Sequence, residues 1–214
     1  MSVFHGGDVW RGPSPDEILD FSANLNPEGP PGWVRAAMLK GLENARYYPD
    51  LRQGAALAGL SAHLGLPEKC ILPTAGGIEA IACAAGLSGC HAVAQPTFQE
   101  YGALCGVHRD VLRSELADYR PEPGETLWLC NPNNPTGEAL PRGEVLALLE
   151  KLEAVGGRLV VDEAFIDYCP EHSVRDAGSD HPALIVLGSL TKVLAIPGVR
   201  LGYMAAHPDR KSVV

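Results

Sequence analysis

The sequence predicts an α/β fold with a mainly parallel sheet covered by helices on both faces. From Cys70 onward, short runs of continuously apolar residues alternate with stretches of helical pattern. Strands buried on both faces of a parallel sheet have this apolar composition, and helices that alternate with strands supply the covering layers. We expect strands at residues 70–72, 92–94, 126–130, 159–161 and 184–187, and helices at 78–87, 100–107 and 143–155.

The first 70 residues follow a different pattern. Residues 1–31 are rich in Gly, Pro, Asn and Asp, which predicts an irregular N-terminal arm with one brief strand at 18–21. Helical spacing of apolar residues then predicts a helix at 33–42 and a second one through Leu57, Leu60 and Leu64, which ends at Gly65. We therefore divide the chain into an arm at 1–31, expected to form part of the substrate site, and a large domain at 32–214.

Composition excludes several classes of partner. The 214 residues carry a formal net charge of −9 and no run of Lys or Arg, which argues against nucleic acid and anionic membranes. No apolar stretch is long enough to span a bilayer, and the first residues lack the basic and apolar regions of a signal peptide. We therefore expect a cytoplasmic protein that acts on small molecules.

The six cysteines do not have the spacing of a metal site. None forms a C-x-x-C pair, and zinc sites take their ligands in close pairs, so we predict no metal. Most of the cysteines lie within apolar runs, as Cys130 does in Leu127-Trp128-Leu129-Cys130. Buried, reduced thiols are the interpretation that fits a cytoplasmic protein.

A cluster of polar residues follows the apolar run at 184–187. Ser189, Thr191 and Lys192 come directly after it, and Arg200 lies eight positions beyond the lysine. Hydroxyl groups and a guanidinium suit phosphate, and a lysine held among them can attack an aldehyde as a neutral amine. Taken alone, these residues also fit a strand end with a solvated lysine.

Two further motifs follow predicted strands. Gly76-Gly77-Ile78 opens a predicted helix, where backbone N–H groups can bind an anion, although a tight turn is the simpler interpretation of two glycines. Phe98 follows Pro96-Thr97 after the strand at 92–94, and its ring can stack on a planar cofactor or pack in the core. In parallel sheets, ligands bind beyond the carboxyl ends of the strands, where both motifs fall.

The most specific strings follow the next two strands. Asn131-Pro132-Asn133-Asn134-Pro135-Thr136-Gly137 predicts a rigid irregular loop that fixes a side-chain amide. Asp162 ends a fully apolar strand, where a carboxylate needs a partner because its burial alone is costly. A protonated pyridine nitrogen is a suitable partner, whereas the alternative role is that of an exposed helix cap.

Together these motifs resemble the fold-type I, pyridoxal-phosphate-dependent class I/II aminotransferase family, whose large domain is a three-layer αβα fold. By this resemblance Lys192 would bind the aldehyde of pyridoxal 5′-phosphate (PLP), Asp162 would pair with its pyridine nitrogen, and Asn134 would hydrogen-bond O3′. Phe98 would stack on the ring, and Tyr48 would reach the cofactor phosphate of the partner subunit in a homodimer. The resemblance also implies phosphate ligands: the side chains of Ser189, Thr191 and Arg200, and the backbone N–H groups of Gly77 and Ile78.

Within the family, two branches stay open. His5-Gly6-Gly7, residues 20–27 and Phe165 resemble the threonine-phosphate decarboxylase branch; the histidinol-phosphate aminotransferase branch typically has Tyr at the position of Phe165. The first implies a lyase of cobalamin biosynthesis that converts L-threonine O-3-phosphate to (R)-1-aminopropan-2-yl phosphate, with His5 and Asn24 contacting this small phosphorylated amino acid. The second implies 2-oxoglutarate-dependent transamination, and a third interpretation is an inactive PLP-binding fragment.

Two features depart from the family pattern. Ile78 stands where many relatives have a hydroxyl residue, which would remove one donor to the cofactor phosphate. Family members also continue beyond the position of Val214 into a small C-terminal domain that carries an Arg for the substrate carboxylate. We therefore expect the large domain at 32–214 to be incomplete and the C-terminal small domain to be absent from these 214 residues.

Overall fold

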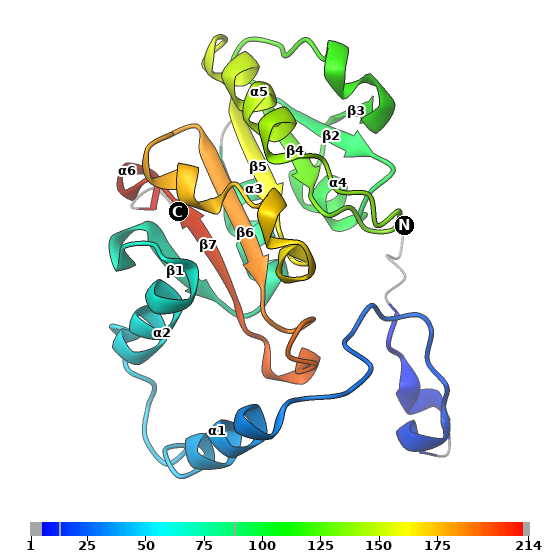
Figure 1. The fold of residues 1–214 in the computed structure, drawn as a ribbon, viewed down its shortest axis with the longest axis vertical. Helices are drawn as coiled ribbons and strands as arrows, with labels where there is room; N and C mark the ends of the chain where they lie inside the picture. Colours follow the sequence, from blue (N-terminus) through cyan, green and yellow to red (C-terminus); the bar gives the residue numbers. More distant parts are fainter. Residues whose placement is uncertain (1–5, 13, 88, 212–214) are drawn as a thin grey trace.

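A seven-stranded sheet lies between two layers of helices in the computed structural model, which describes residues 6–12, 14–87 and 89–211 (Figure 1). The strands are β1 (Ile71–Thr74), β2 (His91–Gln95), β3 (Arg109–Leu112), β4 (Thr126–Cys130), β5 (Arg158–Asp162), β6 (Leu184–Ser189) and β7 (Gly202–Ala206). Their order is β1-β7-β6-β5-β4-β2-β3, and β7 runs antiparallel to both of its neighbours. The pairs among β6, β5, β4, β2 and β3 are all parallel.

The helices of the described residues are α1 (Gly32–Leu42), α2 (Gly54–Leu64), α3 (Gly77–Ala85), α4 (Glu100–Cys105), α5 (Arg142–Glu153) and α6 (Pro208–Lys211), joined by several short 3-10 turns. Four of them, α2 to α5, cover the two faces of the sheet. Side chains of α2 and α5 pack in one apolar core on one face of the sheet. Side chains of α3 and α4 pack in a second core on the other face. This three-layer arrangement confirms the predicted α/β fold.

Sequence pattern predicted the central strands but missed two. β4, β5 and β6 are buried along almost their whole length, as continuous apolar runs require. β3 was missed because it is an edge strand whose residues are exposed except for Val111. β7 was missed because its first residues, Gly202 and Tyr203, directly follow the Arg200 motif, so the apolar run that continues to Ala206 was not read as a strand.

Two predictions from sequence are wrong. Residues 18–21 form no strand, and Leu19 and Phe21 are 82% and 87% exposed, since the arm does not reach a sheet edge with which to pair. Of the cysteines, only Cys70 and Cys130 are buried, although all six are free thiols. Cys90 is exposed because it lies in the turn that precedes β2, outside the apolar run.

The arm and α1 project away from the sheet, as Figure 1 shows in blue. The arm contacts the body through Asn26, whose backbone N–H donates to the carbonyl of Lys192 at 3.2 Å and whose side-chain Nδ2 donates to the carbonyl of Val193 at 3.2 Å. It also contacts the body through Asn24, whose Nδ2 donates to Oδ1 of Asn134 at 3.2 Å. Among the described residues, no helix has both the length and the apolar character to cross a membrane.

Candidate functional site

Most of the predicted site residues lie at the edge of the sheet that is formed by the carboxyl ends of its parallel strands. Asp162 ends β5, where it pairs in register with Cys130 at the end of β4 and with Leu187 near the end of β6. Ser189 ends β6, and the loop that follows carries Thr191 and Lys192. Because the carboxyl ends of parallel strands share one edge, side chains far apart in sequence meet there.

Asp162 is a buried carboxylate that accepts two hydrogen bonds. Its Oδ2 accepts from the hydroxyl of Tyr101 at 2.7 Å, and its Oδ1 accepts from the backbone N–H of Ala164 at 2.9 Å. Burial raises the pKa of Asp162 above its ordinary value, and these two donors and the nearby charge of Lys192 oppose that rise. Among the described residues no Lys or Arg forms a salt bridge with it. A ligand cation would therefore find a prepared partner.

Lys192 lies half-buried between charges of opposite sign. Burial lowers its pKa below the ordinary value, the positive charge of Arg200 lowers it further, and the carboxylate of Asp162 opposes both effects. A lysine in such surroundings has a larger neutral fraction near neutral pH, and the neutral amine is the form that attacks an aldehyde.

A group of donors suited to an anion adjoins this lysine. The hydroxyls of Ser189 and Thr191 are buried and lie 2.8 Å apart. Arg200 has a positive φ of 58°, which is uncommon for a residue with a side chain, and its Nη1 donates to the carbonyl of Pro197 at 3.1 Å. An unusual backbone conformation of this kind often marks a functional position.

The amino end of α3 contributes backbone donors to the same place. A Cβ built on Gly77 would lie 3.6 Å from Cβ of Ser189, and one built on Gly76 would lie 2.5 Å from Nη2 of Arg200. Glycine at position 76, with a φ of 81°, therefore lets the guanidinium lie against the turn. The first N–H groups of a helix, here those of Gly77 and Ile78, have no acceptor within the helix and can bind an anion.

The Asn131–Gly137 loop and the Phe98 turn are tied together by Asn133. Its Oδ1 accepts from the hydroxyl of Thr97 at 3.0 Å, and its Nδ2 donates to the carbonyl of Pro96 at 3.0 Å. The adjacent Asn134 accepts through its Oδ1 from Nδ2 of Asn24 at 3.2 Å, so its own Nδ2 is the atom that can donate to a cofactor oxygen.

The structure does not bring every predicted residue into the cluster. Tyr48 lies between α1 and α2 and is fully exposed. His5 lies outside the described residues. Sequence reasoning also missed Tyr101, Asn26, Thr97 and Asn133, each of which holds a predicted site residue or its loop in place. The sequence could have indicated these four residues only through their positions, since each lies within a motif of the predicted site or within a few residues of one.

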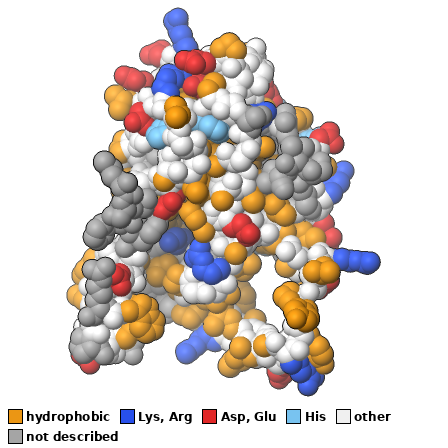
Figure 2. All heavy atoms as spheres, turned by 180° about the vertical axis from the view of Figure 1, so that it is seen from behind, with side chains coloured by type: hydrophobic (Ala, Val, Ile, Leu, Met, Phe, Trp, Pro, Cys, Tyr) orange, Lys and Arg blue, Asp and Glu red, His pale blue; other side chains and the backbone are white. Residues whose placement is uncertain are grey.

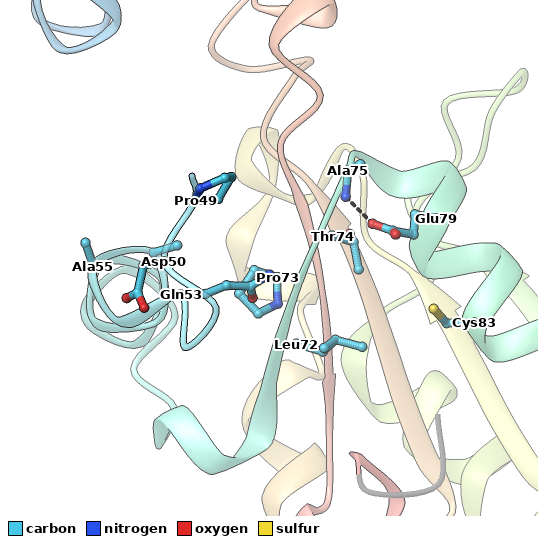
Figure 3. Close-up of a pocket in the computed structure, with 11 residues that line it drawn as sticks. Pro49, Asp50, Gln53, Ala55, Leu72, Pro73, Thr74, Ala75, Glu79 and Cys83 are labelled. Atoms are coloured by element: carbon cyan, nitrogen blue, oxygen red, sulfur yellow. Dashed lines mark hydrogen bonds between the residues drawn. The ribbon is translucent and has the colours of Figure 1, made fainter. Parts of the chain in front are cut away.

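A cavity of about 680 Å³ lies beside the cluster, between α2 and α3 and along β1 (Figure 3). Thr74, Ala75 and Glu79 line it, together with residues of α2 and of the preceding turn, whereas Lys192 and Asp162 do not. The dashed line in Figure 3 marks the hydrogen bond from the N–H of Ala75 to the carboxylate of Glu79. The cavity is thus separate from the cluster around Lys192.

The cluster fits PLP group by group. A buried carboxylate without a salt-bridge partner matches the pyridine nitrogen, and a lysine with a lowered pKa matches the aldehyde. The phosphate matches the hydroxyl pair, Arg200 and the amino end of α3. This correspondence rests on donor and acceptor types at the edge of the sheet, and the role of each residue stays a prediction.

The chain is similar to known enzymes along almost its whole length. It is 38% identical to the threonine-phosphate decarboxylase of Salmonella typhimurium, with 98% of this chain and 64% of that protein aligned. It is 33% identical to the histidinol-phosphate aminotransferase of Aeromonas hydrophila, over 76% of this chain and 50% of that protein. The L-threonine-O-3-phosphate decarboxylase of Porphyromonas gingivalis matches in structure with a TM-score of 0.79 and 25% identity, over 89% of this chain and 63% of that one.

These matches span half to about two thirds of the length of the relatives. The model of the family "Aminotransferase class I and II" matches residues 17–214. The match confirms the resemblance drawn from the motifs, together with the fold class, PLP as the cofactor and PLP-dependent enzymes as the class, at the level of the family. The chain belongs to the class I and II aminotransferase family.

Proposed function

We propose that this chain carries the PLP site of a decarboxylase that converts L-threonine O-3-phosphate to carbon dioxide and (R)-1-aminopropan-2-yl phosphate. The observation that carries the proposal is that Lys192, whose pKa is lowered, and the buried carboxylate of Asp162 lie near each other at the edge of the sheet where anion donors gather. The 38% identity to a threonine-phosphate decarboxylase over 98% of the chain supports the choice of reaction.

Each residue has a defined task in this proposal. PLP, when bound, supplies an electron sink for the electron pair that remains at Cα after a substituent leaves. Asp162 stabilises the protonated pyridine nitrogen, and the anion donors orient the cofactor through its phosphate. Lys192 would hold the cofactor through its side-chain amine and would donate the proton that Cα takes up in place of carbon dioxide.

The contacts of the arm with the Lys192 loop and with Asn134 support a role for the arm in substrate binding. Asn26 binds backbone carbonyls of the Lys192 loop, and Asn24 binds Asn134. Because Asn134 would hold the cofactor, Asn24 would lie near it and could influence which bond at Cα of the substrate breaks. We assign this positioning role to Asn24.

A second candidate is transamination of the histidinol-phosphate type. It shares the cofactor site, and a histidinol-phosphate aminotransferase is 33% identical over 76% of the chain. Phe165 favours decarboxylation, since this position, three residues after Asp162, carries no phenol hydroxyl. A phenol there would donate to O3′ and change the electronic properties of the cofactor.

Product analysis distinguishes the two reactions. The protein is expressed as its gene encodes it, including any sequence beyond Val214, and is incubated with PLP and each substrate. We expect carbon dioxide from L-threonine O-3-phosphate in the absence of any 2-oxo acid. Consumption of histidinol phosphate only in the presence of 2-oxoglutarate, with no carbon dioxide from the first substrate, would establish the aminotransferase instead.

We also propose that the protein acts as a homodimer. The arm and α1 expose large apolar side chains, and Figure 2 shows hydrophobic groups on both projections. Those exposed by 60% or more are Trp10, Leu19, Phe21, Trp33, Leu39 and Leu42, and the segment between α1 and α2 adds Tyr47, Tyr48 and Leu51. Apolar side chains gathered in this way indicate a surface that another chain covers. Light scattering tests the proposal, and a monomer at all concentrations would contradict it.

A further inference from the structure

Tyr101 is a deeply buried polar side chain beside the proposed cofactor site, and nothing in the proposed reaction uses it. It lies in α4 and is 1% exposed. Its ring stacks on Trp128 with centroids 5.6 Å apart, and it meets the ring of Phe98 edge-on at 5.7 Å. Contacts on two sides fix the position of the ring, and therefore that of its hydroxyl.

That hydroxyl donates to Oδ2 of Asp162 at 2.7 Å, while Oδ1 accepts from the N–H of Ala164. Each carboxylate oxygen has two lone pairs, so one donor on each oxygen fixes the plane of the carboxylate and leaves a further acceptor site. Both donors favour the ionised carboxylate over the protonated form. A buried acid without a salt bridge depends on such donors to keep its charge.

The charges around this pair indicate that Tyr101 is always the donor. Burial, followed by the negative charge of Asp162, raises the pKa of Tyr101 well above its ordinary value. The titratable groups that face the pair are Lys192 from the β6 loop, Cys130 from β4 and Glu163 from β5. Burial raises the pKa of Cys130 to about 12, so its thiol stays neutral and Tyr101 is the hydroxyl donor that supports the carboxylate.

We propose that Tyr101 is a positioning residue, which holds Asp162 ionised and aimed at the pyridine nitrogen of PLP. The inference rests on the proposed function. It also links two parts of the site, because the ring of Tyr101 packs against Phe98 while its hydroxyl supports Asp162. Tyr101 thereby fixes the position of the Phe98 ring, which is predicted to stack on the cofactor, relative to the carboxylate of Asp162.

Loss of the hydroxyl has a defined consequence. In Tyr101→Phe, burial acts on Asp162 with one donor fewer, so the carboxylate holds the pyridine nitrogen in its protonated form less firmly. A pyridine ring without this proton withdraws electron density less strongly. The nitrogen of Lys192 that would be joined to the cofactor then becomes more basic. The visible absorption band of bound PLP should then titrate at a higher pH.

The experiment compares Tyr101→Phe with a matched control in the protein as its gene encodes it. Tyr119 is also a buried tyrosine that donates to a buried carboxylate, Glu125 at 2.5 Å, but it lies at the opposite edge of the sheet. Tyr119→Phe therefore removes the same group from the same kind of contact, far from Asp162. The pH midpoint of the PLP band and the Kd for PLP are measured for both variants and for the unaltered protein.

We expect Tyr101→Phe to raise the midpoint by about one pH unit and to weaken PLP binding about tenfold, since a hydrogen bond to a charged group contributes on that order. Tyr119→Phe should lower thermal stability and leave both values unchanged. In an Asp162→Asn background, Tyr101→Phe should not move the midpoint further, because the group through which it acts is already neutral.

The outcomes separate this inference from the proposed function. If the unaltered protein gives no visible band with PLP, the proposed function fails and the role of Tyr101 fails with it. If the band forms but Tyr101→Phe leaves its midpoint within the error of the unaltered protein, only the role of Tyr101 is overturned. An equal shift in Tyr119→Phe would also overturn it, because the effect would then be a general one of stability.

Discussion

Two buried carboxylates, one at the amino ends and one at the carboxyl ends of the parallel strands, differ in whether a cation of the chain lies beside them. Glu125, just before β4, accepts from Arg109 at 2.9 Å and from Tyr119 at 2.5 Å. Burial alone would raise its pKa, but these donors bring the pKa below the ordinary value. Asp162, at the end of β5, has a tyrosine donor but no guanidinium, and its pKa is raised.

The difference distinguishes a carboxylate whose charge is compensated within the chain from one whose charge a ligand could compensate. Glu125 has its cation within the chain, so its charge is compensated as soon as the protein folds. Asp162 has donors that orient it, but a cation would have to come from a ligand. Burying a charge without a cation costs folding free energy, and proteins tolerate this cost mainly where a ligand supplies the opposite charge. Acids with perturbed pKa values therefore cluster at functional sites.

The largest expected effect comes from neutralising each carboxylate in turn. Asp162→Asn should lower turnover of the PLP-loaded enzyme by about 100- to 1,000-fold, because the preorganised charge opposite the pyridine nitrogen is lost. Its free energy of unfolding should stay constant or rise, since an uncompensated buried charge is removed. Steady-state kinetics and urea unfolding measure the two quantities.

Glu125→Gln should have the reverse profile. We expect the free energy of unfolding to fall by about 2–3 kcal/mol, somewhat less than for a fully buried pair because Arg109 is partly exposed. PLP affinity and turnover of the folded fraction should not change. Equal losses of stability in both variants, with turnover retained in Asp162→Asn, would mean that the two carboxylates do not differ in kind.

Glu163 is a third buried acid, which accepts hydrogen bonds but forms no salt bridge among the described residues, although the charge of Arg175 acts on it. Its carboxylate accepts from Ser173 at 2.8 Å and from the N–H of Val174 at 2.7 Å, yet burial raises its pKa from 4.5 to about 7. Between these two values the folded protein binds more protons than the unfolded chain, so stability should fall as the pH rises, by up to about 3 kcal/mol.

Unfolding by urea from pH 4.5 to 7.5 measures this slope. Glu163→Gln resembles the protonated acid at every pH, so the variant should lose most of the decline and be more stable than the unaltered protein at pH 7.5. A decline of the same size in both proteins would assign the pH dependence to other groups.

The smallest effect concerns the anion donors. Gly76→Ala places a Cβ within 2.5 Å of Nη2 of Arg200 and should weaken PLP binding about tenfold by displacing the guanidinium. Gly65→Ala is the matched control: Gly65 has a similar positive φ of 69°, but a Cβ there meets nothing within 4 Å. Gly65→Ala should lose about 1 kcal/mol of stability, and Gly76→Ala should lose more, because its ψ of 176° at positive φ is a conformation that residues with side chains avoid. Equal PLP affinities would contradict the assignment of this turn.

Local pattern predicted the central strands and most of the residues that lie together at the proposed site, because each motif directly follows an apolar run. It could not predict contacts that depend on how distant segments meet. Nothing in the sequence pairs Tyr101 with Asp162, 61 positions later, or Asn26 with the carbonyl of Lys192. β3 was not predicted for the same reason, since residues 109–112 form a strand because they pair with β2 rather than because of their own composition.

The account depends most on Lys192, which the structure places between Arg200 and Asp162. The most direct test is reduction of the PLP-loaded protein with borohydride, followed by mass spectrometry of its peptides. We expect the cofactor on Lys192 and no visible band in Lys192→Ala. The chain contains four other lysines, Lys40, Lys69, Lys151 and Lys211. Cofactor trapped on one of these, with Lys192 unmodified, would contradict the assignment of this edge of the sheet as the PLP site.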